Sequence, residues 1–212
     1  MKLKKLKEKM PKSFKEWFEY FIIFLGFLPV FILAFFLVAS PVRYLFLPKE
    51  VKLYEKALSS IYDGERVEAL EYFNKALEID PDYWIVYRDR SQIYLEMAKY
   101  DDAISDLTKA IELNPSSSTS YYYRGNVYFE LEKYEEAIED YGKAISIDPE
   151  DGSYYYNRGK AYEKKGDIEK EREDYYKGCD LGNSFACDRL KWIILKEKKE
   201  GKFEIEKYIK KE

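Results

Sequence analysis

The sequence contains no histidine and only two cysteines among its 212 residues. Histidine is the usual general base of nucleophilic triads and the commonest metal ligand, so its absence excludes most sites of both kinds. Two thiols without histidine do not complete a tetrahedral zinc site. A Gly-rich phosphate loop and a G-x-S-x-G motif are also missing. We therefore expect no enzymatic activity, no metal, no other cofactor and no small-molecule substrate.

Glycine and proline are scarce, at 10 and 7 residues, whereas charged residues make up 36% and aromatic residues 18%. This composition is typical of an all-α fold with a charged surface and an aromatic core. The net charge of −4 is unevenly distributed, because residues 1–43 carry eight basic and three acidic side chains. The rest of the chain is therefore strongly acidic, which argues against nucleic acid as a partner.

One long stretch, residues 20–42, has no charged side chain over 23 positions. As a helix it would extend about 34 Å, enough to cross the hydrocarbon core of a bilayer. The alternatives are a cleaved signal peptide and a buried core helix. The stretch is longer than a typical signal-peptide core, and it has no polar face to place toward solvent. We expect an uncleaved transmembrane helix.

The basic residues around this stretch predict its orientation. Seven lysines precede it in residues 1–19, whereas four basic residues follow it closely. This bias favours a cytoplasmic N-terminus. We expect a single-pass protein of the cytoplasmic membrane with a basic cytoplasmic segment at 1–19, a connector at 43–49 and an extracytoplasmic domain after it.

From residue 50 onward the sequence repeats itself every 34 residues. Pro81, Pro115 and Pro149 share one register, and so do Ala69, Ala103 and Ala137. Each period reads as two amphipathic helices that end at the proline, which cannot donate the backbone hydrogen bond of a helix. A fixed period of this length indicates a stacked helical array.

The residue types at these positions resemble the tetratricopeptide repeat, whose pattern has an aromatic, a small residue, Tyr, Ala, an aromatic, Ala and Pro. The resemblance covers residues 50–183, with units starting at 50, 84, 118 and 152. It implies a right-handed superhelical solenoid of helix pairs. Small residues would let the two helices of a unit approach closely, and they are Ala57, Ser91, Gly125 and Gly159.

The fourth unit departs from this pattern. Glu171 and Gly178 stand where alanines are expected, and Asn183 replaces the proline. With KGCDLGNSFACDRL, the unit resembles the related SEL-like repeat. Residues 184–212 follow as a predicted capping helix and a charged tail, because apolar residues recur there at helical spacing.

The repeat resemblance also implies which residues face a ligand. In each first helix, the resemblance implies that the second, fifth, ninth, twelfth and thirteenth positions of the unit line the concave surface. Tyrosine rings and amide side chains there suit a peptide or protein segment. The alternative is that these are solvated helix faces. The candidates for a partner-binding groove are Arg88, Gln92, Tyr122, Asn126, Phe129, Glu130, Tyr156 and Lys160.

The two cysteines, Cys179 and Cys187, are separated by seven residues. In related secreted SEL-like repeat proteins this spacing marks a disulfide between neighbouring helices, and an extracytoplasmic location would permit it. Two buried free thiols are the other interpretation. The sequence leaves both open.

Together these patterns predict a membrane-anchored interaction scaffold or adaptor that binds a peptide or protein segment in the groove of its repeats. The alternative is a holdase-type chaperone or assembly factor for translocated envelope proteins. A third hypothesis is a regulatory module that faces the cytoplasm.

Overall fold

The computed structural model describes residue 44 and residues 47–201. Over this part of the chain every regular element is an α-helix, and no strand is present. The all-α prediction is confirmed. The predicted basic segment 1–19, the predicted membrane span 20–42 and the tail from residue 202 lie outside the described residues. No described helix is both long and apolar enough to cross a membrane.

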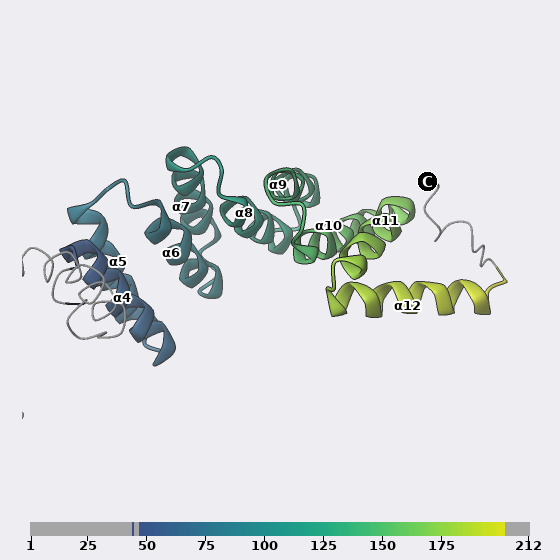
Figure 1. The fold of residues 1–212 in the computed structure, drawn as a ribbon, viewed down its shortest axis with the longest axis horizontal. Helices are drawn as coiled ribbons and strands as arrows, with labels where there is room; N and C mark the ends of the chain where they lie inside the picture. Colours follow the sequence, from purple (N-terminus) through teal and green to yellow (C-terminus); the bar gives the residue numbers. More distant parts are fainter. Residues whose placement is uncertain (1–43, 45–46, 202–212) are drawn as a thin grey trace, which may run out of the picture. The chain divides into compact units, whose positions relative to one another are not determined.

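The helices follow one another as antiparallel pairs (Figure 1). Their bounds are α4 Lys49–Tyr62, α5 Arg66–Ile79, α6 Trp84–Glu96, α7 Tyr100–Leu113, α8 Ser118–Glu130, α9 Tyr134–Ile147, α10 Gly152–Lys165, α11 Ile168–Asp180 and α12 Ser184–Lys199. The chain divides into two compact units, Met1–Lys52 and Leu53–Glu212. In the first unit, the Lys52 ammonium lies 5.7 Å from the centroid of the Tyr44 ring. The second unit holds the repeats.

The residues before the repeat prolines leave the helical conformation, as the sequence predicts. Asp80, Asn114 and Asp148 have φ angles of −127°, −138° and −133°. A residue before proline is driven out of the helical region by the proline ring. The helix that follows each connection then begins at the predicted start of a unit, at Trp84, Ser118 and Gly152.

Alanines at the centre of the first three pairs let the two helices approach closely. The fully buried ones that share the 34-residue register are Ala57, Ala69, Ala76, Ala103, Ala110, Ala137 and Ala144. Larger side chains, such as Phe73, Leu107 and Tyr141, fill the remaining space and are also buried. The core is therefore a row of small clusters along the stack, which is the usual organisation of repeat proteins.

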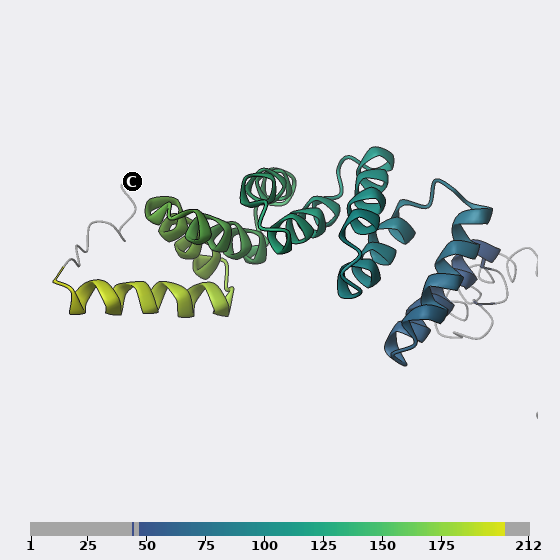
Figure 2. The ribbon, with the colours of Figure 1, turned by 180° about the vertical axis from the view of Figure 1, so that it is seen from behind.

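The fourth pair packs by different residues. Gly178 replaces the second alanine, and a Cβ there would lie 3.0 Å from the Ala186 Cβ of α12 and 3.0 Å from the Gly152 carbonyl oxygen. Glycine is required because three helices meet at this point. Seen from behind, α12 lies against α10 and α11 (Figure 2). A disulfide joins Cys179 of α11 to Cys187 of α12.

Candidate functional site

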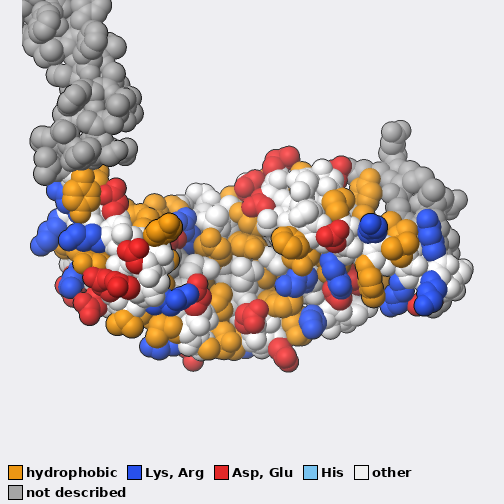
Figure 3. Space-filling model, turned by 90° about the horizontal axis from the view of Figure 1, so that it is seen from below, with side chains coloured by type: hydrophobic (Ala, Val, Ile, Leu, Met, Phe, Trp, Pro, Cys, Tyr) orange, Lys and Arg blue, Asp and Glu red, His pale blue; other side chains and the backbone are white. Residues whose placement is uncertain are grey.

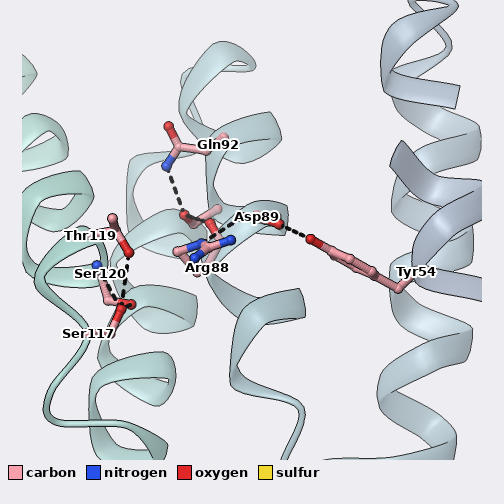
Figure 4. A network of polar contacts seen from close by, with 8 residues as sticks. Tyr54, Arg88, Asp89, Gln92, Ser117, Thr119 and Ser120 are labelled. Carbon is pink, nitrogen blue, oxygen red and sulfur yellow. Dashed lines mark hydrogen bonds and ion pairs between the residues drawn. The ribbon is translucent and has the colours of Figure 1, made fainter. Parts of the chain in front are cut away.

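The first helices of successive pairs are joined side by side by specific contacts. The Tyr54 hydroxyl of α4 donates a hydrogen bond of 2.7 Å to Asp89 of α6 (Figure 4). The Asn157 amide of α10 donates one of 2.7 Å to the Tyr122 hydroxyl of α8. Helices α6 and α8 are also in contact. One face of α4, α6, α8 and α10 thus contributes to a common surface.

A hollow of about 260 Å³ lies on this surface, across three successive first helices. Leu95 comes from α6, and Asn157 comes from α10. Four of the eight candidates from the sequence line it together, and they are Asn126, Phe129, Glu130 and Lys160. The lining also includes Tyr141 of α9. The hollow therefore combines apolar side chains, two amides and one charge of each sign.

Lys160 is the cation of the hollow. Its ammonium lies 4.7 Å from the centroid of the Phe129 ring and 5.7 Å from that of Tyr156. The ion pairs formed within residues 47–201 do not include Lys160. Aromatic faces attract an ammonium group while leaving its N–H donors available. Lys160 can therefore donate to a ligand without first breaking an internal ion pair.

Asn126 is held in place by the residue beneath it. The Tyr141 hydroxyl donates a hydrogen bond of 2.8 Å to Asn126 Oδ1. Tyr141 is 1% exposed, and burial raises the pKa of its phenol. The Asn126 side chain keeps hydrogen-bonding capacity for a carbonyl or carboxylate, because its NH₂ group carries two N–H donors.

Tyr122 of α8 contacts both α9 and α10. Its ring centroid lies 5.0 Å from that of Tyr154 and 6.0 Å from that of Tyr141. Its hydroxyl accepts from Asn157, and burial raises its pKa above the ordinary tyrosine value. Tyr122 is absent from the lining of the hollow. It joins α8 to α10 through Tyr154 and Asn157.

Arg88, Gln92 and Tyr156 also lie outside the lining of the hollow. Arg88 donates from Nε to Asp89 at 2.7 Å, and Gln92 donates to the Ser91 hydroxyl at 3.2 Å (Figure 4). Tyr156 packs against Tyr175 and Phe185. The structure brings these three residues into contacts within the stack rather than into the hollow.

Two residues of the hollow, Tyr141 and Asn157, lie outside the ligand-facing positions that the sequence predicts, whereas Leu95 occupies the twelfth position of its unit. A signal for Asn157 exists in the sequence. Tyr54 and Asp89 are 35 residues apart, and so are Tyr122 and Asn157. A tyrosine followed by a polar residue one period plus one position later marks a hydrogen bond between neighbouring first helices.

A second recurrent feature stabilises the pairs from within. Three arginines of first helices form bidentate ion pairs with aspartates 16 residues later in the second helices, Arg90–Asp106, Arg124–Asp140 and Arg158–Asp174. Burial raises the pKa of each aspartate, although the arginine opposes that rise. Such geometry fixes the orientation of one helix relative to the other. These pairs are already occupied and contribute no free charge to a ligand.

The charges on one face of the molecule are mixed. Figure 3 shows acidic and basic side chains interspersed with hydrophobic ones, without a continuous field of one sign on this face. Recognition on such a surface depends on local groups rather than on a large electrostatic field.

Comparison with protein families identifies tetratricopeptide repeats along this part of the chain. One model matches residues 92–131 and 125–166, a second matches 72–105, and a third matches 53–83 and 152–181. The matches include the fourth unit. Comparison with curated proteins found no significant match.

Solved structures of the same fold include several tetratricopeptide proteins. MamA 41-end from Desulfovibrio magneticus RS-1 is 21% identical, with a TM-score of 0.63 over 71% of this chain and 87% of its own. A crystal structure of MamA is 22% identical, with a TM-score of 0.58 over 69% and 97% of the two chains. The first TPR of Spaghetti (RPAP3), bound to the HSP90 peptide SRMEEVD, is 29% identical, with a TM-score of 0.53 over 54% and 91%.

Proposed function

We propose that this chain, whose residues 53–181 are tetratricopeptide repeats, is an interaction scaffold that binds a segment of another protein. The observation that carries the proposal is the hollow across α6, α8 and α10, where Lys160 has no carboxylate partner within residues 47–201. The amides of Asn126 and Asn157 would pair with the backbone of the segment. Leu95 and Phe129 would contact its apolar side chains. The proposed activity is binding without catalysis.

The solved relative with a bound peptide supports this proposal. It is 29% identical to this chain, and its repeats hold the HSP90 peptide SRMEEVD. The same fold here presents donors and apolar groups in a hollow on its first helices. We infer from this likeness that the ligand is a segment of another protein.

We further propose that residues 20–42 anchor the scaffold in the cytoplasmic membrane with its repeats outside the cytoplasm. The support is the uncharged stretch of 23 residues and the seven lysines that precede it. Protease added to intact spheroplasts should digest the repeats. Protection of the repeats would instead favour the regulatory module that faces the cytoplasm.

Photo-crosslinking tests the groove directly. A photoreactive phenylalanine derivative at Phe129 should trap a discrete partner in native membranes, identified by mass spectrometry. The matched control places the same group at Lys143, an exposed residue of α9 outside the hollow. Equal products from both positions, or none from Phe129, would exclude the hollow as the binding site.

A holdase-type chaperone or assembly factor is the second candidate. It is favoured by apolar side chains that are exposed on the first pair, including Tyr62 at 92% and Val67 at 69%. Such a protein should suppress aggregation of unrelated unfolded proteins, whereas a scaffold should not. Crosslinking at Phe129 would then give many products instead of one.

A further inference from the structure

The surface that contains the hollow changes its chemistry from one end of the stack to the other. Leu58, Gln92, Asn126 and Lys160 occupy the same position of successive units, 34 residues apart. The series runs from an aliphatic side chain through two amides to a cation. Because the hollow joins the last two members to Leu95 of α6, the register places the whole series along one face.

The aliphatic end lies on α4. Leu58 and Ile61 are 40% and 39% exposed, and Tyr62 beside them is 92% exposed. These residues lie one period before Gln92, Leu95 and Glu96, so Ile61 and Leu95 extend the same apolar row. Adjacent exposed apolar side chains of this kind are more informative than single ones, because they favour an apolar ligand.

The cationic end lies on α10, and its neighbouring acids do not neutralise it. Glu163 of the same helix accepts a hydrogen bond of 2.8 Å from the Tyr175 hydroxyl and pairs with Arg189. Glu130 also lines the hollow, but it is exposed to solvent, which weakens its field. Lys160 thus remains available for an acidic side chain.

We propose that the bound segment is itself graded, with apolar side chains at one end and an acidic side chain at the other. This inference rests on the proposed function. The apolar end would lie on Leu58, Ile61 and Tyr62, and the acidic side chain would pair with Lys160. From α4 to α10 there are three steps between neighbouring first helices, each of about 8–10 Å. A segment that reaches from one end to the other would therefore span about 24–30 Å, or about eight residues of extended chain.

Selection from a library of random twelve-residue peptides, displayed on phage, tests the grading, because it requires no natural partner. The full-length chain, in one detergent throughout, should enrich peptides with Leu, Ile or Phe in one half and Asp or Glu in the other. Lys160→Glu should replace the acids by Lys or Arg and leave the apolar half unchanged. The double variant Leu58→Gln/Ile61→Gln should remove only the apolar preference.

Binding of one enriched peptide provides the quantitative test. Lys160→Met should weaken binding about tenfold, as expected for one charge-assisted contact. Lys143→Met, at an exposed lysine of α9 outside the hollow, is the matched control and should leave binding unchanged. All variants should retain the helical circular dichroism and melting temperature of the parent, since the substituted side chains are exposed or lie at the hollow.

The two proposals fail in different ways. If no peptide is enriched by the full-length chain, the peptide-binding groove itself is wrong. If peptides are enriched but acids and apolar residues are not segregated, only the grading is wrong. The same holds if Lys160→Glu selects the same peptides as the parent.

Discussion

Gly125 leaves room for the ring of Tyr141. A Cβ at this position would lie 2.8 Å from Tyr141 Cε1 and 3.3 Å from the carbonyl oxygen of Ala137. Tyr141 is buried and fixed by its hydrogen bond to Asn126, so it cannot move away freely. The absence of one methyl group thereby allows α8 and α9 to pack and holds an amide of the hollow in place.

Gly125→Ala should therefore lower the free energy of unfolding by about 1–3 kcal/mol, because it overpacks the interface. Gly142→Ala in α9 is the matched control, since its Cβ would meet nothing closer than Arg158 Nη1 at 3.7 Å. That variant should raise the free energy of unfolding by about 0.5–1 kcal/mol through helix propensity. Urea unfolding followed by circular dichroism measures both. Equal effects would contradict the assigned packing.

At the scale of the helix pair, the turn between the two helices is as periodic as the core. The residues at 64, 98, 132 and 166 all have positive φ, but only two of them are glycines. Ala98 has a φ of 54° and Glu132 a φ of 58°. After each comes a backbone hydrogen bond that closes the turn, such as that from Lys99 N to the Tyr94 carbonyl at 2.8 Å. Glycine usually occupies this left-handed position at the end of a helix. At two of the four turns, alanine or glutamate occupies it instead.

Ala98→Gly and Glu132→Gly should each stabilise the protein by about 0.5–1 kcal/mol, because a residue with a Cβ is strained in this conformation. Gly64→Ala and Gly166→Ala are the matched reverse changes. A Cβ at either glycine would have no neighbour within 4 Å, so they report backbone strain alone. Both should lower the melting temperature. If all four variants changed the melting temperature in the same direction, the strain explanation would be wrong.

The bidentate arginine–aspartate pairs belong to the same scale. Arg124 also donates from Nη1 to Thr108 of the preceding second helix at 3.2 Å, and Arg90 donates to Asn74 in the same way at 2.6 Å. Each of these arginines therefore joins its own pair to the one before. Because a point-like ammonium cannot make all of these hydrogen bonds, the geometry explains why arginine occupies these positions.

At the scale of the whole molecule, partly or fully buried tyrosines are distributed along the stack. Burial raises the pKa of Tyr54, Tyr94, Tyr141 and Tyr175 above the ordinary value of 10.0, so every unit contains at least one such phenol. In a linear array each unit is stabilised by its neighbours, so a loss of stability in one unit also destabilises the next unit. The pH dependence of stability should therefore be a property of the entire array.

The folded protein should lose stability as the pH rises above about 10. A raised folded-state pKa means that the folded state keeps its phenol protons longer than the unfolded chain does. The stabilising contribution is complete below the unfolded pKa and is lost as the pH rises toward the folded pKa. Urea unfolding at several alkaline pH values measures the decline. Tyr141→Phe should make the decline shallower, and parallel curves for the two proteins would contradict this assignment.

The sequence by itself determined the helices, their ends and their register. Prolines, capping residues and small residues act over a few positions, so Trp84, Ser118 and Gly152 could be predicted as helix starts from the 34-residue period. The period also placed Asn126, Phe129, Glu130 and Lys160 on one face, and these residues do line the hollow.

Only the tertiary structure decided which residues of that face remain available. A helical register gives the direction in which a side chain points but not what the next unit places in front of it. Tyr122 is covered by Tyr154 and bonded to Asn157, whereas Lys160 meets two rings and no carboxylate within residues 47–201. This difference depends on contacts between successive units, which is why the period alone could not separate a residue that lines the hollow from one that joins two helices.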